Sequence, residues 1–498
     1  MVYKVRISKI VVNRIIGFSI SLGLLTGCVQ TEVVLQSLTP DPASFSTFAE
    51  PAPTPVPTRP VYEPGTLVDY TAQTGDSLTA LAAHFNTTVK EILEVNPLIQ
   101  KDITTLQAGL VLKIPIYYKA LWGSQFQILP DSLFINGPQQ IGFDTAAFVN
   151  SYPGWLKNYS SFSGGANRRG GDLIDYVAQT FSISPRLLLA LAEYQTGALT
   201  NPELDPDKTL FPLGYKDQFH KGFYLQLVWA ANLLNNGYYG WRNGRLDTIT
   251  RSDGTMEVPD PWQNSATVAL QHYFSHKLSP DEYRQAIYHE GIYQTYVTLF
   301  GDPWQNFQTH IPGNLQQEDL TLPFAAGKTW ALTGGPHAAW GEGEPYAALD
   351  FAPPGVVGGC SNSSEFVTAV ADGQIVRTEP AVALLDLDQD GDERTGWVIL
   401  YLHLGLNDMV RPGVLLKAGD PVGHPSCEGG TATGTHVHIA RKYNGEWVDA
   451  DSAVPFNLEG WVAKNGSEPY LGTLKRFSKT ITASLSASPS SLITAEKK

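Results

Sequence analysis

The chain has 498 residues, of which 43% are hydrophobic, so it is long enough for about three domains with cores of their own. Its formal net charge is −14, from 34 basic and 48 acidic residues. An acidic surface repels phosphate backbones, and we therefore expect no nucleic-acid partner.

Residues 1–28 have the pattern of an export signal. Four basic residues precede an apolar stretch, residues 15–25, that is too short to span a bilayer comfortably. The stretch leads into Leu25-Thr26-Gly27-Cys28, which resembles a bacterial lipobox. The resemblance implies lipidation of Cys28, and hence an exported protein that is lipid-anchored to a bacterial membrane and faces the cell envelope. The alternative is an ordinary secretory signal in which Cys28 occurs by chance.

Two further segments are predicted to lie outside the folded domains. Residues 29–66 form a linker, because their Pro-rich run at 51–58 favours an extended, polyproline-like spacer. Residues 478–498 are rich in Ser, Thr and Ala and are predicted to be a disordered tail.

Residues 67–116 combine two short strand patterns with two short helical patterns. Within them, Gly75-Asp76-Ser77-Leu78 and Asn96-Pro97 resemble the signatures of a LysM domain. The resemblance implies a βααβ fold that binds N-acetylglucosamine-containing glycans in a groove. The groove would be lined by Gly75, Asp76, Ser77, Asn96, Pro97, Leu98 and Ile99. For Asp76 and Asn96, a purely structural role in capping and turning the fold is the alternative.

Residues 122–308 show helical periodicity and many aromatic residues, which predicts a helical domain with an aromatic core. The segment 183–196 faintly resembles the start of a lysozyme-like lytic transglycosylase domain. Where that family has its catalytic Glu, this chain has Gln195, and an amide cannot donate the proton that glycosidic cleavage needs. Glu193 lies two residues away on a different helix face. We therefore expect a lysozyme-like scaffold that holds glycan or spaces the domains, without catalysis of its own.

Residues 320–465 contain three segments that could together hold a metal ion. His436-Val437-His438 on a strand would place both imidazoles on one face, because strand side chains alternate with period 2. His403 lies on another apolar strand, and Asp350 opens a Pro-rich loop. Zinc binds imidazole nitrogen and carboxylate oxygen, and a catalytic site keeps one position open for water. For the His-x-His pair alone, two satisfied surface histidines are the alternative.

Together these segments resemble the lysostaphin-like (LytM-type) zinc endopeptidases, which cut peptide bonds in peptidoglycan. The resemblance spans residues 323–449 and is also carried by 369–376 and 417–423. It implies an antiparallel β-sheet domain with one Zn²⁺, held by Asp350 and His438. His403 and His436 would orient water and stabilise the oxyanion.

One position departs from the family pattern. Four residues before Asp350, where the family has its first histidine ligand, this chain has Tyr346, and a neutral phenol with a pKa near 10 is a poor zinc ligand. His337, 13 residues before Asp350, is the candidate substitute. The alternative is a degenerate site in a peptidoglycan-binding or amidase-activating module.

The last two cysteines, Cys360 and Cys427, flank the proposed metal segments. An exported protein meets oxidising conditions, which favours a disulfide between them; a Cys-ligated zinc is the alternative.

The acidic segment around Asp386, Asp388 and Asp390 has the D-x-D-x-D-G spacing of the first half of a calcium loop. Position 12 of that loop is Trp397 instead of Glu, so the full pattern fails. The spacing thus predicts either a Ca²⁺ site or a solvated acidic hairpin.

The sequence as a whole predicts a multidomain α+β protein. We expect a zinc metalloendopeptidase that binds peptidoglycan through its N-acetylglucosamine glycan and its stem peptides. The membrane is the second expected partner, reached through the lipid anchor at Cys28.

Overall fold

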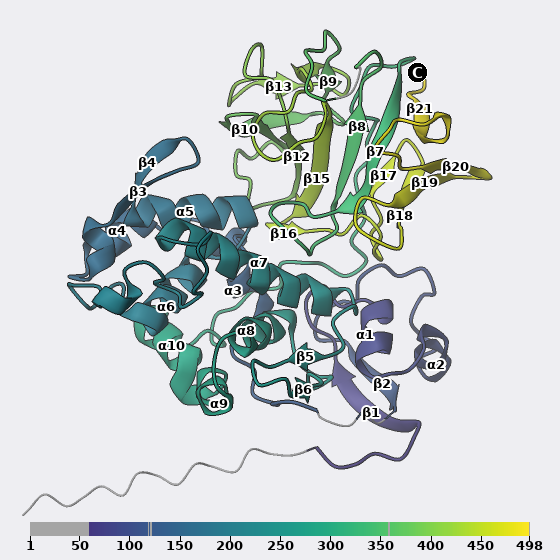
Figure 1. Cartoon of the computed structure of the whole chain (residues 1–498). Coiled ribbons are helices and arrows are strands. Elements are labelled where there is room, and N and C mark those ends of the chain that lie inside the picture. Colours follow the sequence, from purple (N-terminus) through teal and green to yellow (C-terminus); the bar gives the residue numbers. More distant parts are fainter. Residues whose placement is uncertain (1–58, 118, 120–121, 357–358, 498) are drawn as a thin grey trace, which may run out of the picture. The chain divides into compact units, whose positions relative to one another are not determined.

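The computed structural model describes residues 59–117, 119, 122–356 and 359–497 (Figure 1), and all of them belong to one compact unit. The predicted export signal, the lipidated Cys28 and most of the Pro-rich linker lie outside the described residues. None of the helices in the described part is long and apolar enough to cross a membrane.

The N-terminal unit has the predicted βααβ order. Strand β1 (Thr66–Thr71) pairs antiparallel with β2 (Val111–Ile116), and helices α1 (Leu78–His84) and α2 (Val89–Val95) lie between them in sequence. Both helices begin at side-chain caps. Ser77 caps α1, and Thr88 forms a reciprocal capping box with Glu91. Leu81, Phe85 and Ile92 are fully buried at helical spacing and close the small core.

The middle region is helical, as the periodicity predicts. Its helices are α3 (Asp131–Phe134), α4 (Thr145–Asn150), α5 (Gly170–Phe181), α6 (Pro185–Thr196), α7 (Phe223–Arg242), α8 (Ser265–Ser275), α9 (Pro280–Ala286) and α10 (Gln294–Phe300). The residues at both ends of helix α6 explain where it begins and ends. Ser184 caps its first turn, Pro185 takes the position that needs no amide donor, and Gly197 ends it at φ +62°.

Two short hairpins interrupt these helices. Strand β3 (Ser160–Ser163) pairs with β4 (Ala166–Arg169), and β5 (Ile249–Thr250) pairs with β6 (Met256–Glu257). Neither hairpin was expected from the helical periodicity.

The C-terminal domain is built on a nine-stranded antiparallel sheet with the order β13-β10-β11-β12-β15-β8-β7-β21, in which β16 also pairs with β15. Figure 1 shows β12, β15, β8 and β7 side by side. Their bounds are β7 (Thr329–His337), β8 (Ala348–Ala352), β10 (Gly373–Glu379), β11 (Val382–Asp386), β12 (Trp397–Leu402), β13 (Leu415–Leu416), β15 (Val437–Tyr443), β16 (Glu446–Trp447) and β21 (Leu492–Thr494).

Smaller sheets flank the large one. A four-stranded sheet contains β17 (Asn457–Leu458), β18 (Trp461–Asn465), β19 (Gly472–Arg476) and β20 (Lys479–Thr482), and β9 (Val367–Thr368) pairs with β14 (Pro421–Gly423).

The disorder predicted for residues 478–498 is wrong. Strand β20 joins the four-stranded sheet, and β21 pairs with β7 in the large sheet, with Leu492 opposite Ala331. Ile493 and Ala495 are buried in the core under that sheet. The composition did not predict these strands, because a few apolar residues at alternate positions suffice for a strand when a partner strand is available for pairing.

Both faces of the large sheet are covered. On β12, Val398, Leu400 and Leu402 belong to the core that also contains the helical domain, whereas Ile399 and Tyr401 lie in the core of the β domain. Helices and sheet therefore share one continuous apolar core, and the β domain would expose an apolar face if it were excised.

Candidate metal centre

Three adjacent strands bring the predicted metal ligands together. His337 ends β7, Asp350 lies in β8 and His438 lies in β15. The register places His438 directly opposite Asp350, and β-bulges in β7 shift His337 towards both. Gly334 lies opposite Asp350 on β7, where a Cβ would come within 2.5 Å of a carboxylate oxygen, so the close approach of these strands requires glycine.

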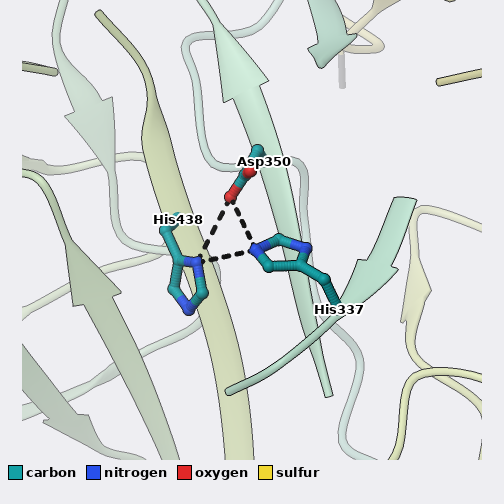
Figure 2. Close-up of side chains that lie close together, drawn as sticks. All are labelled: His337, Asp350 and His438. Atoms are coloured by element: carbon teal, nitrogen blue, oxygen red, sulfur yellow. Dashed lines mark hydrogen bonds and ion pairs between the residues drawn. The ribbon is translucent and has the colours of Figure 1, made fainter. Parts of the chain in front are cut away.

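The three side chains point at one common spot, as Figure 2 shows. His337 Nε2 lies 3.0 Å from His438 Nδ1, and each of these nitrogens lies 3.3 Å from Asp350 Oδ1. All three residues are buried.

Backbone carbonyls fix the tautomers of both imidazoles. His337 Nδ1 lies 2.8 Å from the carbonyl oxygen of Gly335, and His438 Nε2 lies 3.0 Å from that of Ala339. Carbonyl oxygens only accept, so both of these nitrogens must carry the proton. The other nitrogen of each ring therefore presents a lone pair to the common spot.

The lone pairs and Asp350 Oδ1 form a set of acceptors without a donor. Asp350 Oδ1 is buried and accepts no hydrogen bond within the described residues. Tetrahedral zinc with bonds of about 2.0–2.1 Å has its ligand atoms about 3.3 Å apart, close to the 3.0–3.3 Å found here. The residues thus fit a zinc ion with one position left for water.

The Asp350 carboxylate favours positive charge beside it, although burial lowers the pKa of His438. Burial alone would raise the pKa of Asp350, but His337 and His438 outweigh it and hold that pKa well below its usual range. Burial alone would lower the pKa of His337, but the Asp350 carboxylate more than offsets burial and raises it.

The two remaining histidines lie beside this cluster. His403 Nδ1 donates to the carbonyl of Glu428 and His436 Nδ1 to that of Gly434, both over 2.7 Å. Their ring centroids are 4.5 Å apart, and His436 Nε2 lies 3.8 Å from Asp350 Oδ1. Burial and the neighbouring His436 lower the pKa of His403 to about 4, so its ring is neutral at pH 7.

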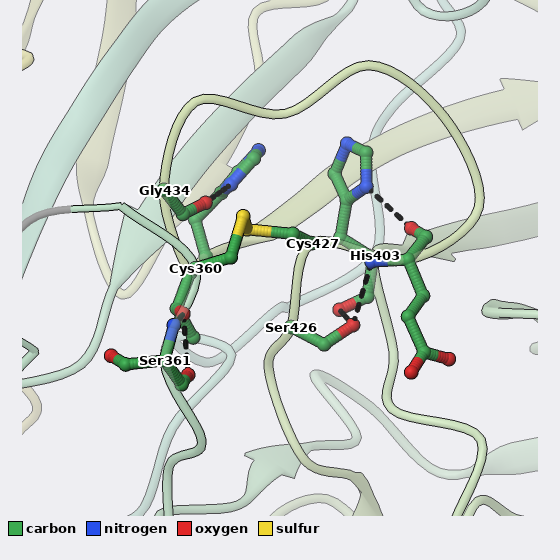
Figure 3. The surroundings of a disulfide bond; sticks show 9 residues. Cys360, Ser361, His403, Ser426, Cys427 and Gly434 are labelled. Atoms are coloured by element: carbon green, nitrogen blue, oxygen red, sulfur yellow. Dashed lines mark hydrogen bonds between the residues drawn. A yellow bond between two sulfur atoms is a disulfide. The ribbon is translucent and has the colours of Figure 1, made fainter.

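The disulfide between Cys360 and Cys427 is present, as predicted (Figure 3). Next to Cys427, Ser426 donates its backbone N–H to the carbonyl of His403 over 2.7 Å, and its own carbonyl accepts from His436 N–H over 3.2 Å. On the Cys360 side, Ser361 N–H donates to Thr435 Oγ1 over 2.9 Å. The disulfide thus joins the two loops whose backbones are bonded to His403, His436 and the neighbouring Thr435.

Tyr346 takes no part in the cluster. Its ring lies under the guanidinium of Arg245, with the Cζ atom 5.2 Å from the ring centroid. The position that the family pattern assigns to a ligand therefore lies outside the cluster, and His337 is its third member.

Tyr470 is a neighbour of the site that no sequence motif indicated. Its ring stacks on His337, with centroids 4.1 Å apart and planes 22° apart. Its carbonyl accepts the N–H of Gly335, whose own carbonyl orients His337. Only the meeting of the small sheet with β7 places Tyr470 here.

Helix α7 supports the loop that orients His438. Residues 338–345 contain Ala339, the acceptor for His438, and the loop docks on the helix through two amides. Asn232 Oδ1 accepts from Glu342 N–H over 2.9 Å, and Asn236 Oδ1 accepts from Glu344 N–H over 2.7 Å. The two asparagines are four residues apart and so share a helix face.

Two residues of the predicted glycan groove, Asp76 and Asn96, form hydrogen bonds within the LysM unit itself. Asp76 is buried and accepts from the Tyr70 hydroxyl over 2.7 Å, and Asn96 exchanges hydrogen bonds with the backbone of Lys113. For both residues the structural alternative is therefore seen. Of the remaining groove residues, Gly75 is buried, Ser77 and Ile99 are half-buried, Pro97 is exposed and Leu98 is 97% exposed.

The substituted catalytic position in the helical domain is also engaged. Gln195 Oε1 accepts from Lys277 Nζ over 2.7 Å, and Glu193 accepts from the backbone of Leu199. These contacts suit a structural role for α6, and the lysozyme-like resemblance itself stays a prediction.

Comparison with known proteins supports the predicted domains. Residues 70–115 match the LysM domain, and residues 127–314 match the N-terminal domain of LasA. The chain contains a LysM domain. The helical region is similar to the LasA N-terminal domain over nearly its whole length.

The chain is also similar to individual proteins. It is 25% identical over 346 residues to "Protease LasA" of Pseudomonas aeruginosa, covering 65% of this chain and 76% of the relative. It is 30% identical over 136 residues to "Beta-lytic metalloendopeptidase" of Achromobacter lyticus, covering 26% of this chain and 34% of the relative. The chain is also similar to the solved structure of pseudoalterin, an M23 metalloprotease from the deep sea, with 24% sequence identity and a TM-score of 0.29. The match covers 34% of this chain and 96% of the pseudoalterin chain. The sequence matches support the combination of a LysM domain with a lysostaphin-like metallopeptidase domain.

Proposed function

We propose that the chain is an exported zinc metalloendopeptidase that binds peptidoglycan and hydrolyses peptide bonds in its stems or cross-links. The observation that carries the proposal is the convergence of two imidazole lone pairs and a buried carboxylate oxygen on one spot, with two further histidines beside it. A site that only braced the fold would pair these acceptors with donors.

His337, Asp350 and His438 would hold the zinc. When bound, the ion would polarise the scissile carbonyl and lower the pKa of a water molecule to about 7. The carbonyls of Gly335 and Ala339 keep the ligand rings in the tautomers that zinc needs, as the second partners of metal-bound histidines commonly do.

His403 and His436 would act on the reacting peptide. Each directs its Nδ1 proton to a backbone carbonyl, so its Nε2 atom is free to accept a proton from water or, once protonated, to donate to the oxyanion and the leaving amine. The low pKa of His403 keeps it neutral and able to accept at pH 7.

The alternative, a binding or amidase-activating module, was motivated by Tyr346. That motive weakens because His337 lies with Asp350 and His438 in one cluster and would complete the ligand set. The sequence of the export signal supports placing the protein at the cell envelope, with Cys28 as its lipid anchor.

For the glycan we propose a position next to the predicted groove. Beside the groove, Thr74 Oγ1 accepts from Ile311 N–H over 3.0 Å, and the carbonyl of Thr105, also in the LysM unit, accepts from Asn314 N–H over 2.8 Å. A cleft of about 840 Å³ lies alongside, between β1 and the helical domain. Trp304 and the 48% exposed Phe307 line it and offer aromatic faces on which sugar rings can stack.

The test uses the mature chain without Cys28, since the domains share a core. With purified peptidoglycan and zinc, new amino groups should appear, and a chelator should prevent their release. His436→Ala should abolish release while the bound zinc is retained, whereas Asp350→Ala should lose both. Background amine release from several peptidoglycan types with zinc bound would contradict an endopeptidase and favour the binding module.

A further inference from the structure

We propose that the loop between β11 and β12 binds one Ca²⁺ through Asp386, Asp388 and Asp390, independently of the zinc centre. The three side chains each offer a carboxylate oxygen, and these oxygens lie within 4.8 Å of one another.

The buried member of the cluster supplies the main argument. Asp386 is fully buried, and its Oδ1 has no hydrogen-bond partner within the described part of the chain, while Oδ2 accepts from Gly391 N–H over 3.0 Å. A buried carboxylate oxygen without a donor is costly, and a bound cation would satisfy it.

The basic side chains around the loop are bonded to other carboxylates. Arg394 pairs with Asp392 over 2.6 Å, and Arg377 and Lys442 pair with Glu393 over 2.6 and 2.7 Å. Because these basic side chains are paired elsewhere, they do not neutralise the three aspartates, and a cation from solution can do so.

The backbone directs the three side chains to one side. Gln389 and Gly391 have φ values of +62° and +88°, and these two left-handed residues turn the chain between the aspartates. Asp390 N–H donates to Asp388 Oδ1 over 3.3 Å, and Asp392 N–H donates to Asp390 Oδ1 over 2.8 Å. Asp390 Oδ2 also accepts from Thr395 Oγ1, over 2.6 Å. The loop thus fixes all three carboxylates and leaves Asp386 Oδ1 without a donor among the described residues.

The number and type of the ligands favour calcium and predict a modest affinity. Ca²⁺ takes six to eight oxygen ligands in flexible geometry, which suits three carboxylates completed by carbonyls and water. Trp397 occupies the position where a full calcium loop has a bidentate Glu. With fewer charged ligands, we expect a Kd of about 10⁻⁴–10⁻³ M, the range of extracellular calcium modules.

Calcium there would stiffen the hairpin and its contact with the helical domain. Arg394 Nη1 donates to the carbonyl of Gln140 over 3.1 Å, and Gly396 N–H donates to Asn444 Oδ1 over 2.8 Å. Both contacts start from the loop, so fixing the loop would also fix them. We therefore infer a stabilising role for the ion.

Terbium luminescence tests the inference on the mature chain with zinc present. Tb³⁺ takes oxygen sites of this kind, and Trp397 close to the loop can sensitise it. We expect one saturable signal per chain that Ca²⁺ displaces, and millimolar Ca²⁺ should raise the unfolding midpoint by about 2–4 °C.

Variants of exposed residues make the test specific without threatening the fold. Asp388→Asn should weaken Tb³⁺ and Ca²⁺ binding at least tenfold and abolish the Ca²⁺-dependent shift of the midpoint. The control is Asp408→Asn, at an exposed carboxylate elsewhere in the β domain, which removes an equal charge outside the cluster and should retain binding. Absence of saturable binding, or equal loss in both variants, would overturn the inference.

Discussion

Helix α7 should control zinc affinity although it contributes no ligand. In the double variant Asn232→Ala/Asn236→Ala, the loop at 338–345 loses the two hydrogen bonds that dock it on the helix. Each such bond contributes about 1 kcal/mol, so docking weakens by about 2 kcal/mol, or about thirtyfold in the docked population at most. Because Ala339 in that loop orients His438, apparent zinc affinity should fall by up to the same factor.

Competition with a chromogenic chelator would measure this affinity directly, without reference to turnover. Alanine favours helix more than asparagine does, so α7 itself should stay folded. The matched control is Asn232→Asp/Asn236→Asp, which keeps an acceptor oxygen at each position and should retain most of the affinity. If the alanine variant bound zinc as tightly as the parent, the other contacts of the loop, among them the ion pair between Glu344 and Arg245, would suffice to dock it, and the reasoning would fail.

Three further predictions concern the metal ligands, the disulfide and the cleft. His337→Ala should reduce bound zinc as measured by atomic absorption; unchanged stoichiometry would show that His337 is no ligand. Cys360→Ser/Cys427→Ser opens a loop with a sequence separation of 67, which corresponds to about 4 kcal/mol of stability by chain entropy. Amine release should then fall while zinc stays bound, because the ligands lie on strands; joint loss of zinc and activity would argue against this division. Trp304→Ala should weaken binding of an N-acetylglucosamine tetramer about tenfold in calorimetry, whereas Leu98→Ala on the exposed loop should not; the reverse result would return the glycan to the predicted groove.

Local sequence patterns predicted the βααβ unit, the helical region and the residues that form the buried cluster. Period-2 alternation predicted His436 and His438 on one strand; in the structure β15 begins at Val437, so only His438 lies in it and His436 immediately precedes it. Turn signatures located the βααβ unit, because they depend on residues a few positions apart. The pairing of Cys360 with Cys427 followed from their number and from the oxidising environment of an exported protein.

Only the tertiary structure showed which distant groups complete the site. His337 and His438 are 101 positions apart, and their lone pairs meet because strand register and the bulges in β7 bring them together. The carbonyl of Ala339 and the ring of Tyr470 have no sequence signature, since any residue supplies a carbonyl and an isolated tyrosine has no motif.

The difference between local patterns and long-range packing also explains why the tail and the glycan groove differ from the predictions. The tail at 478–498 has a disordered composition, yet it pairs with β7 because that strand offers an open edge and a place for Ile493. The groove signature of the LysM unit is intact, but Thr74 and Thr105 are bonded to residues more than 200 positions later. Sequence fixes what each segment can form, because those preferences are local; which segments meet depends on the packing of the whole chain.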